Sequence, residues 1–284
     1  MRKTAVTIAF MLLSGTSYGL FSTNDSGTSA MQFLNLGTGA RAYGLGQAFT
    51  GVSDDATAIY WNPAGTRQIK SACVSLTHSK WLSDISNDIA VFVYPQKGIG
   101  SIGLGVQYVS YGSMLKVDDT GMNIEGEIKP HDLAAVFSYA IDISESMNGL
   151  SAGVSIKYVE SKIMNTARGA GIDLGLMYNM QNKLRLGAVA RNIGTQVKFV
   201  DKKSGLPVEI RIGAGCNITP VWLVSLDIDE AEGSGFNYRV GTEYEYLIGC
   251  DIGLVGRAGY NSFNRNVSEK KEISLGFGLL YQRY

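Results

Sequence analysis

The chain has little proline, cysteine and histidine. Its 284 residues include five prolines, three cysteines and two histidines. Scarce proline leaves the backbone hydrogen bonds of long strands uninterrupted. The cysteines, Cys73, Cys216 and Cys250, are odd in number and widely spaced, so they match neither a disulfide framework nor a metal-ligand pattern. At most one disulfide can form among them, and we expect no metal site and no other cofactor.

The chain also lacks a surplus of either charge. Lysine plus arginine and aspartate plus glutamate each total 25, which gives a formal net charge of +0. Without a basic surplus to neutralise phosphates, we expect no nucleic-acid partner.

Long apolar runs are missing beyond the start of the chain. Two basic residues, an apolar run over 5–13 and the small residues Ser17 and Gly19 predict a cleaved signal peptide over residues 1–19. That run is far shorter than the roughly 20 residues that a membrane-spanning helix needs, and no later stretch comes close. The sequence therefore excludes a helical membrane protein.

From about residue 72 onward the chain instead alternates apolar residues with small or polar ones. The clearest copy spans 100–111, with a large apolar side chain at every second position. A period of two is typical of β-strands with one apolar face. Twelve such runs can be counted, near 72–80, 87–95, 100–111, 131–142, 149–162, 169–180, 184–195, 207–217, 220–230, 235–246, 250–260 and 271–282.

The connections between these runs alternate in length. Residues 96–99 and 180–183 make short turns, whereas 112–130 and 261–270 make long loops. Short turns at one end, long loops at the other and aromatic residues near strand ends are typical of outer-membrane barrels. With the predicted signal peptide, they favour an all-β transmembrane protein in contact with outer-membrane lipid. We predict an antiparallel up-and-down outer-membrane β-barrel over residues 67–284, with a water-soluble β-sandwich as the alternative.

Charged residues of both signs lie on the face opposite to the apolar one. Ionised side chains are tolerated inside a barrel only where water or opposite charges are present. We therefore expect a polar lumen with ion pairs between neighbouring strands, and selection of a substrate as the alternative role of these residues. The candidate lumen charges are Arg185, Arg191, Arg211, Arg239, Arg257, Asp173, Glu209, Asp227 and Glu243.

Residues 20–66 do not alternate. Asp54 or Asp55 can cap a short helix over 56–61, and Pro63 ends it because the residue before a proline disfavours helical geometry. A compact, half-apolar segment ahead of a barrel needs a place to pack, and about twelve to fourteen strands enclose a lumen that a small domain can fill. We predict that residues 20–66 form an internal hatch.

The hatch also carries a family resemblance. The stretch 37–65, GTGARAYGLGQAFTGVSDDATAIYWNPAG, with its Asn-Pro-Ala step at 62–64, resembles the N-terminal signature of the PorV/PorQ (UPF0164) group. That group is itself similar to the FadL-type outer-membrane transporters, and the likeness continues through 76–81 and 103–112. The resemblance implies an outer-membrane barrel whose hatch blocks the lumen. FadL-like members pass fatty acids or aromatic hydrocarbons toward a lateral opening in the wall, whereas PorV-like members serve protein secretion through the type IX route.

Two features depart from the FadL pattern. FadL-like barrels have fourteen strands, so a further pair of strands near 66–71 and 113–128 is the alternative to the twelve counted. The predicted external loops are also short for a site that captures a ligand at the surface.

An outer-membrane enzyme is a rival that the residues do not favour. A nucleophile and base would have to come from His78 or His131 with a serine such as Ser110 or Ser138, and neither serine lies in a recognisable motif. We expect no enzymatic activity.

The first functional hypothesis is a passive outer-membrane transporter of hydrophobic, fatty-acid-like compounds, with an apolar small molecule as its ligand. The alternative is a PorV-like component of a type IX protein secretion pathway that binds exported proteins. The expected ligand and hatch residues are Phe33, Leu34, Leu36, Phe49, Ile59, Trp61, Asn62, Pro63 and Ala64.

Overall fold

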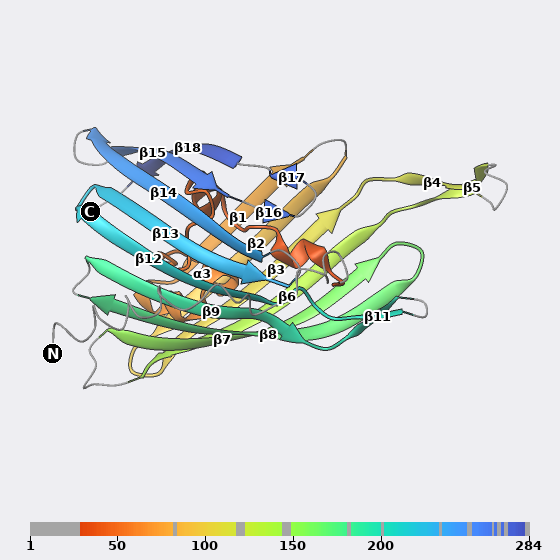
Figure 1. The fold of residues 1–284 in the computed structure, drawn as a ribbon, viewed down its shortest axis with the longest axis horizontal. Helices are drawn as coiled ribbons and strands as arrows, with labels where there is room; N and C mark the ends of the chain where they lie inside the picture. Colours follow the sequence, from red (N-terminus) through yellow and green to blue (C-terminus); the bar gives the residue numbers. More distant parts are fainter. Residues whose placement is uncertain are drawn as a thin grey trace.

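The computed structural model describes residues 29–81, 84–117, 123–143, 149–180, 183–199, 202–232, 235–248, 252–262, 264–265, 268–269 and 272–281. Within them, a 12-stranded antiparallel sheet forms a curved wall, with neighbouring strands following sequence order (Figure 1). All twelve predicted runs are strands of this wall, so the predicted barrel architecture is confirmed. The strands are β1 (Cys73–Lys80), β2 (Ser86–Gln96), β3 (Gly100–Ser110), β6 (His131–Asp142), β7 (Leu150–Lys162), β8 (Thr166–Met180), β9 (Leu184–Gly194), β12 (Glu209–Thr219), β13 (Trp222–Ala231), β14 (Gly235–Ile248), β15 (Ile252–Asn261) and β18 (Glu272–Tyr281).

The alternative of fourteen wall strands is wrong for the described residues. The region 113–128 does form strands, β4 (Met114–Val117) and β5 (Asn123–Ile128), but they pair only with each other and project from one end of the wall (Figure 1). Residues 66–71 contain the end of a 3-10 helix and no strand. Two further small sheets in the long loops were not predicted, because runs of two or three residues are too short to show a period. They pair β10 (Val197–Phe199) with β11 (Lys202–Ser204), and β16 (Asn264–Arg265) with β17 (Ser268–Glu269).

Alternation along the strands separates an outer apolar face from an inner face that covers the hatch. In β2, Val91 and Val93 point inward and are buried, whereas Phe92 and Tyr94 point outward and are exposed. Successive residues of a strand point to opposite faces, so a period of two places all the outward side chains on one face of the wall.

The described residues before β1, from residue 29 onward, lie inside the curved wall and contain four short helices (Figure 1). The predicted helix over 56–61 is found as α3 (Ala58–Trp61), and it ends at Trp61, two residues before Pro63. The expected capping by Asp54 or Asp55 is wrong, because Thr57 occupies the N-cap position of α3 and no side chain caps the helix. Asp55 instead accepts the backbone N–H of Thr57 at 2.9 Å in the turn before the helix. The other helices are η2 (Gln32–Asn35), α2 (Ala40–Gly44) and η3 (Pro63–Gln68). None of the helices in the described residues is long and apolar enough to cross a membrane.

Inward-facing glycines bring the wall into contact with the hatch. A Cβ atom on Gly241 of β14 would lie 2.5 Å from the carbonyl oxygen of Leu45, and one on Gly103 of β3 would lie 2.5 Å from Cγ2 of Ile59. Both distances are shorter than any normal contact, so these positions require glycine for close approach. We name the inward-facing wall glycines whose Cβ atoms would lie within 3.2 Å of a hatch atom the glycine belt. It comprises Gly103, Gly105, Gly153, Gly175, Gly187, Gly213, Gly215, Gly241, Gly259 and Gly276.

Candidate functional site

The hatch and the wall meet first in an apolar cluster near the end of the barrel that carries the long loops. Phe33 and Leu34 of η2 are buried there, and Leu36 packs against the cluster from its edge. We name it the loop-end cluster. Its buried members are Ala30, Met31, Phe33, Leu34, Val109, Ala134, Val159, Ala167, Val197 and Leu206.

A second apolar cluster lies deeper, around Trp61. The rings of Trp61 and Phe49 meet edge to face, with centroids 6.1 Å apart, and the indole Nε1 donates to the Thr38 carbonyl at 2.8 Å. The guanidinium groups of Arg191 and Arg211 lie 5.7 and 5.2 Å from the Trp61 ring, within the range of cation–π attraction. Trp61 therefore links the apolar hatch to the charged wall.

Ile59 faces another part of the wall. It is fully buried in a third cluster with Ile89, Val91 and Val93 of β2 and Val136 of β6.

The Asn-Pro-Ala step fastens the hatch to strand β8. The Asn62 Nδ2 group donates to the carbonyls of Leu176 at 3.0 Å and Thr50 at 3.3 Å, and its Oδ1 accepts the Ala64 N–H at 3.2 Å. Pro63 occupies the first turn of η3, where its missing N–H costs nothing. All three residues are buried. Their geometry supports the expected role of holding the hatch turn.

The predicted lumen charges form a network of inward ion pairs, which we name the charge belt. Glu209 is held by Arg191 at 2.8 Å and by Arg211 at 2.6 Å, and Arg211 also lies 3.8 Å from Asp227. These four residues are at most 5% exposed, so each charge depends on its partners for stabilisation. Asp173 pairs with Lys157 at 2.6 Å, and Arg239 pairs with Asp229.

Charged residues of the wall also bind the hatch through ion pairs and hydrogen bonds. Glu243 pairs with Arg257 at 2.5 Å and with Arg41 of α2 at 2.8 Å. Arg185 pairs with Asp54 of the hatch at 2.7 Å, and Arg41 pairs with Asp54 as well. Asp227 accepts hydrogen bonds from the hatch backbone, from the N–H groups of Phe49 and Thr50 at 3.1 and 2.9 Å.

Burial of Asp54 opposes its ionisation, but the guanidinium groups of Arg41 and Arg185 outweigh burial and hold the pKa of Asp54 below its ordinary value. Asp54 is therefore an anion that joins the hatch to the wall. The sequence indicated Asp54 only as a helix cap and gave no role to Arg41. Asp54 lies 131 residues before its partner Arg185, and Arg41 lies 202 residues before its partner Glu243. No local sequence pattern could identify these two pairs.

The hatch and the wall are tightly packed beside Trp61, whereas a hollow of about 180 Å³ lies between Arg41 and Asp54 of the hatch and Arg185 and Glu243 of the wall. A cavity of about 10 Å³ lies between Leu36, Tyr60, Trp61, Gln107 and Arg191, which is room for about one water molecule. In this conformation, a ligand can enter the region beside Trp61 only if hatch side chains move.

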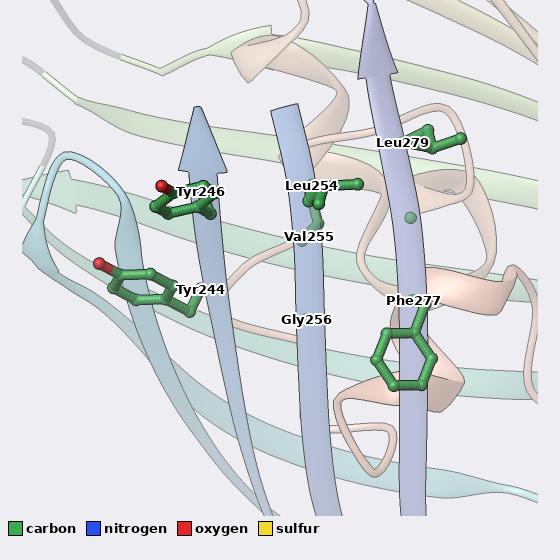
Figure 2. Close-up of a pocket in the computed structure, with 8 residues that line it drawn as sticks. Tyr244, Tyr246, Leu254, Val255, Gly256, Phe277 and Leu279 are labelled. Carbon is green, nitrogen blue, oxygen red and sulfur yellow. The ribbon is translucent and has the colours of Figure 1, made fainter. Parts of the chain in front are cut away.

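A larger hollow lies on the outer face of the wall (Figure 2). Tyr244 of β14, Gly256 of β15 and Phe277 of β18 are direct neighbours across the strands. Because Gly256 has no side chain, the two rings stand on either side of an apolar groove of about 640 Å³. We name it the outer groove. Its lining residues are Tyr244, Tyr246, Leu254, Val255, Gly256, Phe277, Gly278 and Leu279.

Several sequence predictions remain untested by this geometry. The structure places the nine expected hatch residues at buried or partly buried positions, but their role in ligand binding stays a prediction. The predicted signal peptide lies outside the described residues, as does Cys250. Cys73 and Cys216 are free thiols.

Comparison with solved structures finds the same fold in outer-membrane channels. The monoaromatic hydrocarbon channel CymD is 14% identical, with 87% of this chain and 89% of the channel covered and a TM-score of 0.56. The Ralstonia pickettii toluene transporter TbuX is 15% identical, with coverages of 86% and 89% and a TM-score of 0.56. A Pseudomonas aeruginosa FadL homologue is 9% identical, with coverages of 87% and 86% and a TM-score of 0.56. At these identities the likeness establishes the FadL-like barrel fold.

Comparison of the sequence gives the family. No curated protein sequence matches the chain. The family model described as type IX secretion system protein PorV matches residues 22–220, which is well over half of the 284 residues and includes the hatch and the first eight wall strands. The resemblance expected from residues 37–65 is thereby confirmed, and the chain belongs to the PorV family, with the fold of FadL-type outer-membrane channels.

Proposed function

We propose that this protein is a passive outer-membrane transporter of hydrophobic compounds. The observation that carries the proposal is the loop-end cluster, an apolar hatch–wall interface near the end with the long loops. An apolar molecule that replaces hatch side chains there gains affinity from buried apolar area, at roughly 25 cal/mol per Å². The shared fold with channels described for toluene and monoaromatic hydrocarbons supports this ligand class.

Transport would proceed by displacement of the hatch. The ligand first takes the place of Phe33, Leu34 and Leu36, whose contacts with the wall are apolar and need no exact partner. Deeper movement requires that the clusters of Phe49, Ile59 and Trp61 loosen, while Asn62, Pro63 and Ala64 hold the hatch turn on β8. The gradient of the compound is the only energy source that this path requires.

The test is uptake of a radiolabelled fatty acid and of toluene by cells that produce the protein. Phe33→Asp should abolish uptake, because a carboxylate in the loop-end cluster opposes binding of an apolar molecule. The matched control Phe33→Leu keeps an apolar side chain and should retain most uptake. Equal uptake by all three proteins would overturn the proposal.

The hatch itself can be tested separately. Deleting residues 27–66 should raise permeability to small hydrophilic solutes such as sucrose, measured by swelling of proteoliposomes. An unchanged leak would show that the segment does not plug the lumen.

A second candidate function is a component of type IX secretion that binds exported proteins. The match to the PorV family favours it, and so does the β4–β5 hairpin, which projects from the wall and exposes Met114 and Leu115 (Figure 1). A stable protein partner covers on the order of 800 Å² per side.

Native mass spectrometry of gently extracted protein separates the two functions. A bound apolar molecule supports transport, whereas a stoichiometric exported protein with no small ligand supports secretion.

A further inference from the structure

The outer face of strands β1 to β8 changes from apolar to polar within two residues of the loop end. Strand register aligns its outward side chains in rows across β1, β2, β3, β6, β7 and β8. The first row is apolar or aromatic and consists of Leu76, Ala90, Val106, Ala135, Tyr158 and Ala170. The next row is mixed and consists of His78, Asp88, Tyr108, Leu133, Glu160 and Arg168. The row nearest the loops is polar and consists of Lys80, Ser86, Ser110, His131, Lys162 and Thr166. In an outer-membrane barrel, such a step marks the level where hydrocarbon gives way to lipid headgroups.

An apolar groove runs up to this step on strand β2. Its floor is Ala90, and the larger side chains of Leu76 on β1 and Val106 on β3 stand on either side. The groove has a volume of about 460 Å³ and reaches Tyr108 in the mixed row. We name it the β2 groove. Its apolar floor and sides suit a hydrocarbon chain.

Two lysines lie just past the loop end of the β2 groove. The ring of Tyr108 stacks on that of His131, with centroids 5.4 Å apart, and His131 is the direct cross-strand neighbour of Lys162. The His131 Nδ1 group donates to the carbonyl of Lys129 at 3.2 Å, which brings a second lysine to the same place. Both lysines are exposed, and neither forms an ion pair within the part of the chain that the structure describes.

The carboxylates nearest to these lysines on the outer face already have partners. The Asp88 carboxylate lies 2.6 Å from Nδ1 of His78. Glu160 accepts hydrogen bonds from Arg168 at 2.8 Å and from the Tyr158 hydroxyl at 2.9 Å. The two lysines therefore supply positive charge that is free to bind an anion. A phosphate group offers both negative charge and several acceptor oxygens to lysine ammonium groups.

We propose that the β2 groove and the two lysines form a binding site for an anionic lipid, with an acyl chain over Ala90 and the phosphate on Lys129 and Lys162. The two parts of the site follow each other in the order that such a lipid requires, because the groove lies beside the apolar row and the lysines beside the polar one. The site is on the face opposite to the hatch, so the inference does not depend on what the barrel transports.

Native mass spectrometry with added lipid tests the proposal. The full chain in mild detergent is titrated with phosphatidylglycerol and, separately, with diacylglycerol of the same acyl chains. The wild type should bind phosphatidylglycerol more tightly. Lys129→Ala combined with Lys162→Ala should weaken phosphatidylglycerol binding about thirtyfold, as expected for two lysines near an anionic lipid, and leave diacylglycerol binding unchanged. The matched control is Lys97→Ala with Lys183→Ala, which removes two exposed lysines at the short-turn end and should bind both lipids like the wild type.

The groove is tested separately from the charges. Ala90→Phe fills the floor of the β2 groove and should weaken binding of both lipids. Ala188→Phe is its matched control, because it adds the same ring to the outer face on β9, away from β1 to β3 in the sheet. This control should bind both lipids like the wild type.

Three results would overturn the proposal. The first is equal affinity of the wild type and the double lysine variant for phosphatidylglycerol. The second is an equal loss of binding in the variants and their matched controls, since the lipid then binds the outer face without selecting this site. The third comes from a parallel titration with inorganic phosphate. If phosphate ions bind at the two lysines and no lipid is retained, the site binds a free anion and no lipid.

Discussion

The hatch meets the wall through two interfaces of different chemistry. In the loop-end cluster the contacts are apolar, and an apolar contact can be replaced by any ligand of similar shape. In the charge belt the contacts are ion pairs and hydrogen bonds between named partners, such as Glu243 with Arg41 and Asp227 with the N–H of Thr50. Breaking such a pair leaves a buried charge unsatisfied. The charge belt therefore holds the hatch in one position, whereas hatch side chains in the loop-end cluster can be displaced by an apolar ligand.

The largest expected loss of stability follows removal of a buried charge from the charge belt. Glu209→Ala leaves Arg191 and Arg211 without their shared carboxylate in a buried site, which should lower the free energy of unfolding by about 3–5 kcal/mol. Urea unfolding in detergent micelles measures the change. The control Glu160→Ala removes an ion pair with the exposed Arg168 and should leave stability nearly unchanged. Similar losses for both variants would contradict the distinction between buried and exposed pairs.

A smaller loss of stability is expected when a glycine-belt residue, which allows close contact between hatch and wall, gains a side chain. Gly241→Val places a side chain on the Leu45 carbonyl, so it should cost about 1–3 kcal/mol of stability and raise the leak of sucrose as the hatch shifts. Gly256→Val is the matched control, because no atom lies within 4 Å of its Cβ position on the outer groove. If the control leaks as much as Gly241→Val, the glycine belt does not seat the hatch.

A smaller change in stability is expected in the loop-end cluster. Val197→Ala removes two buried methyl groups and should cost about 1–2 kcal/mol. The space that it opens lies where we place the ligand, so uptake should shift in favour of bulkier apolar compounds. Competition between toluene and a long-chain fatty acid measures the shift. An unchanged preference would argue against a ligand at this cluster.

The smallest expected effect is a dependence of hatch stability on pH, through the carboxyl group of Asp54. The pKa of Asp54 is lower in the folded protein than its ordinary value, so its ion pairs stabilise the hatch above the ordinary pKa of aspartate. This stabilisation should be lost progressively as pH falls through the lowered value. Protease cleavage of the hatch, measured across acidic pH, should increase in the wild type. Asp54→Asn lacks the titrating group, and its cleavage should change less over the same range.

The alternating pattern predicted the wall strand by strand because inside and outside differ at every second residue. Asp173, Arg185 and Glu209 could be assigned to the lumen from that period alone, and they are buried there. The pairs that they form could not be assigned, since pairing depends on strand register and on the path of the hatch. The outer groove was missed for the same reason. Tyr244 lies beside Gly256 and Phe277 only because of the register of the three strands, which the alternating pattern does not specify.

The sequence by itself determined a twelve-stranded wall, a polar inner face and an N-terminal segment too irregular to be part of the wall. These properties are local, because they follow from the periodicity of side chains and from proline and glycine positions. Only the tertiary structure decided that Arg41 meets Glu243 across 202 residues and that glycines bring the wall into close contact with the hatch. Both contacts join segments that are far apart in the sequence. They depend on how the wall strands pack around the hatch, which no local pattern specifies.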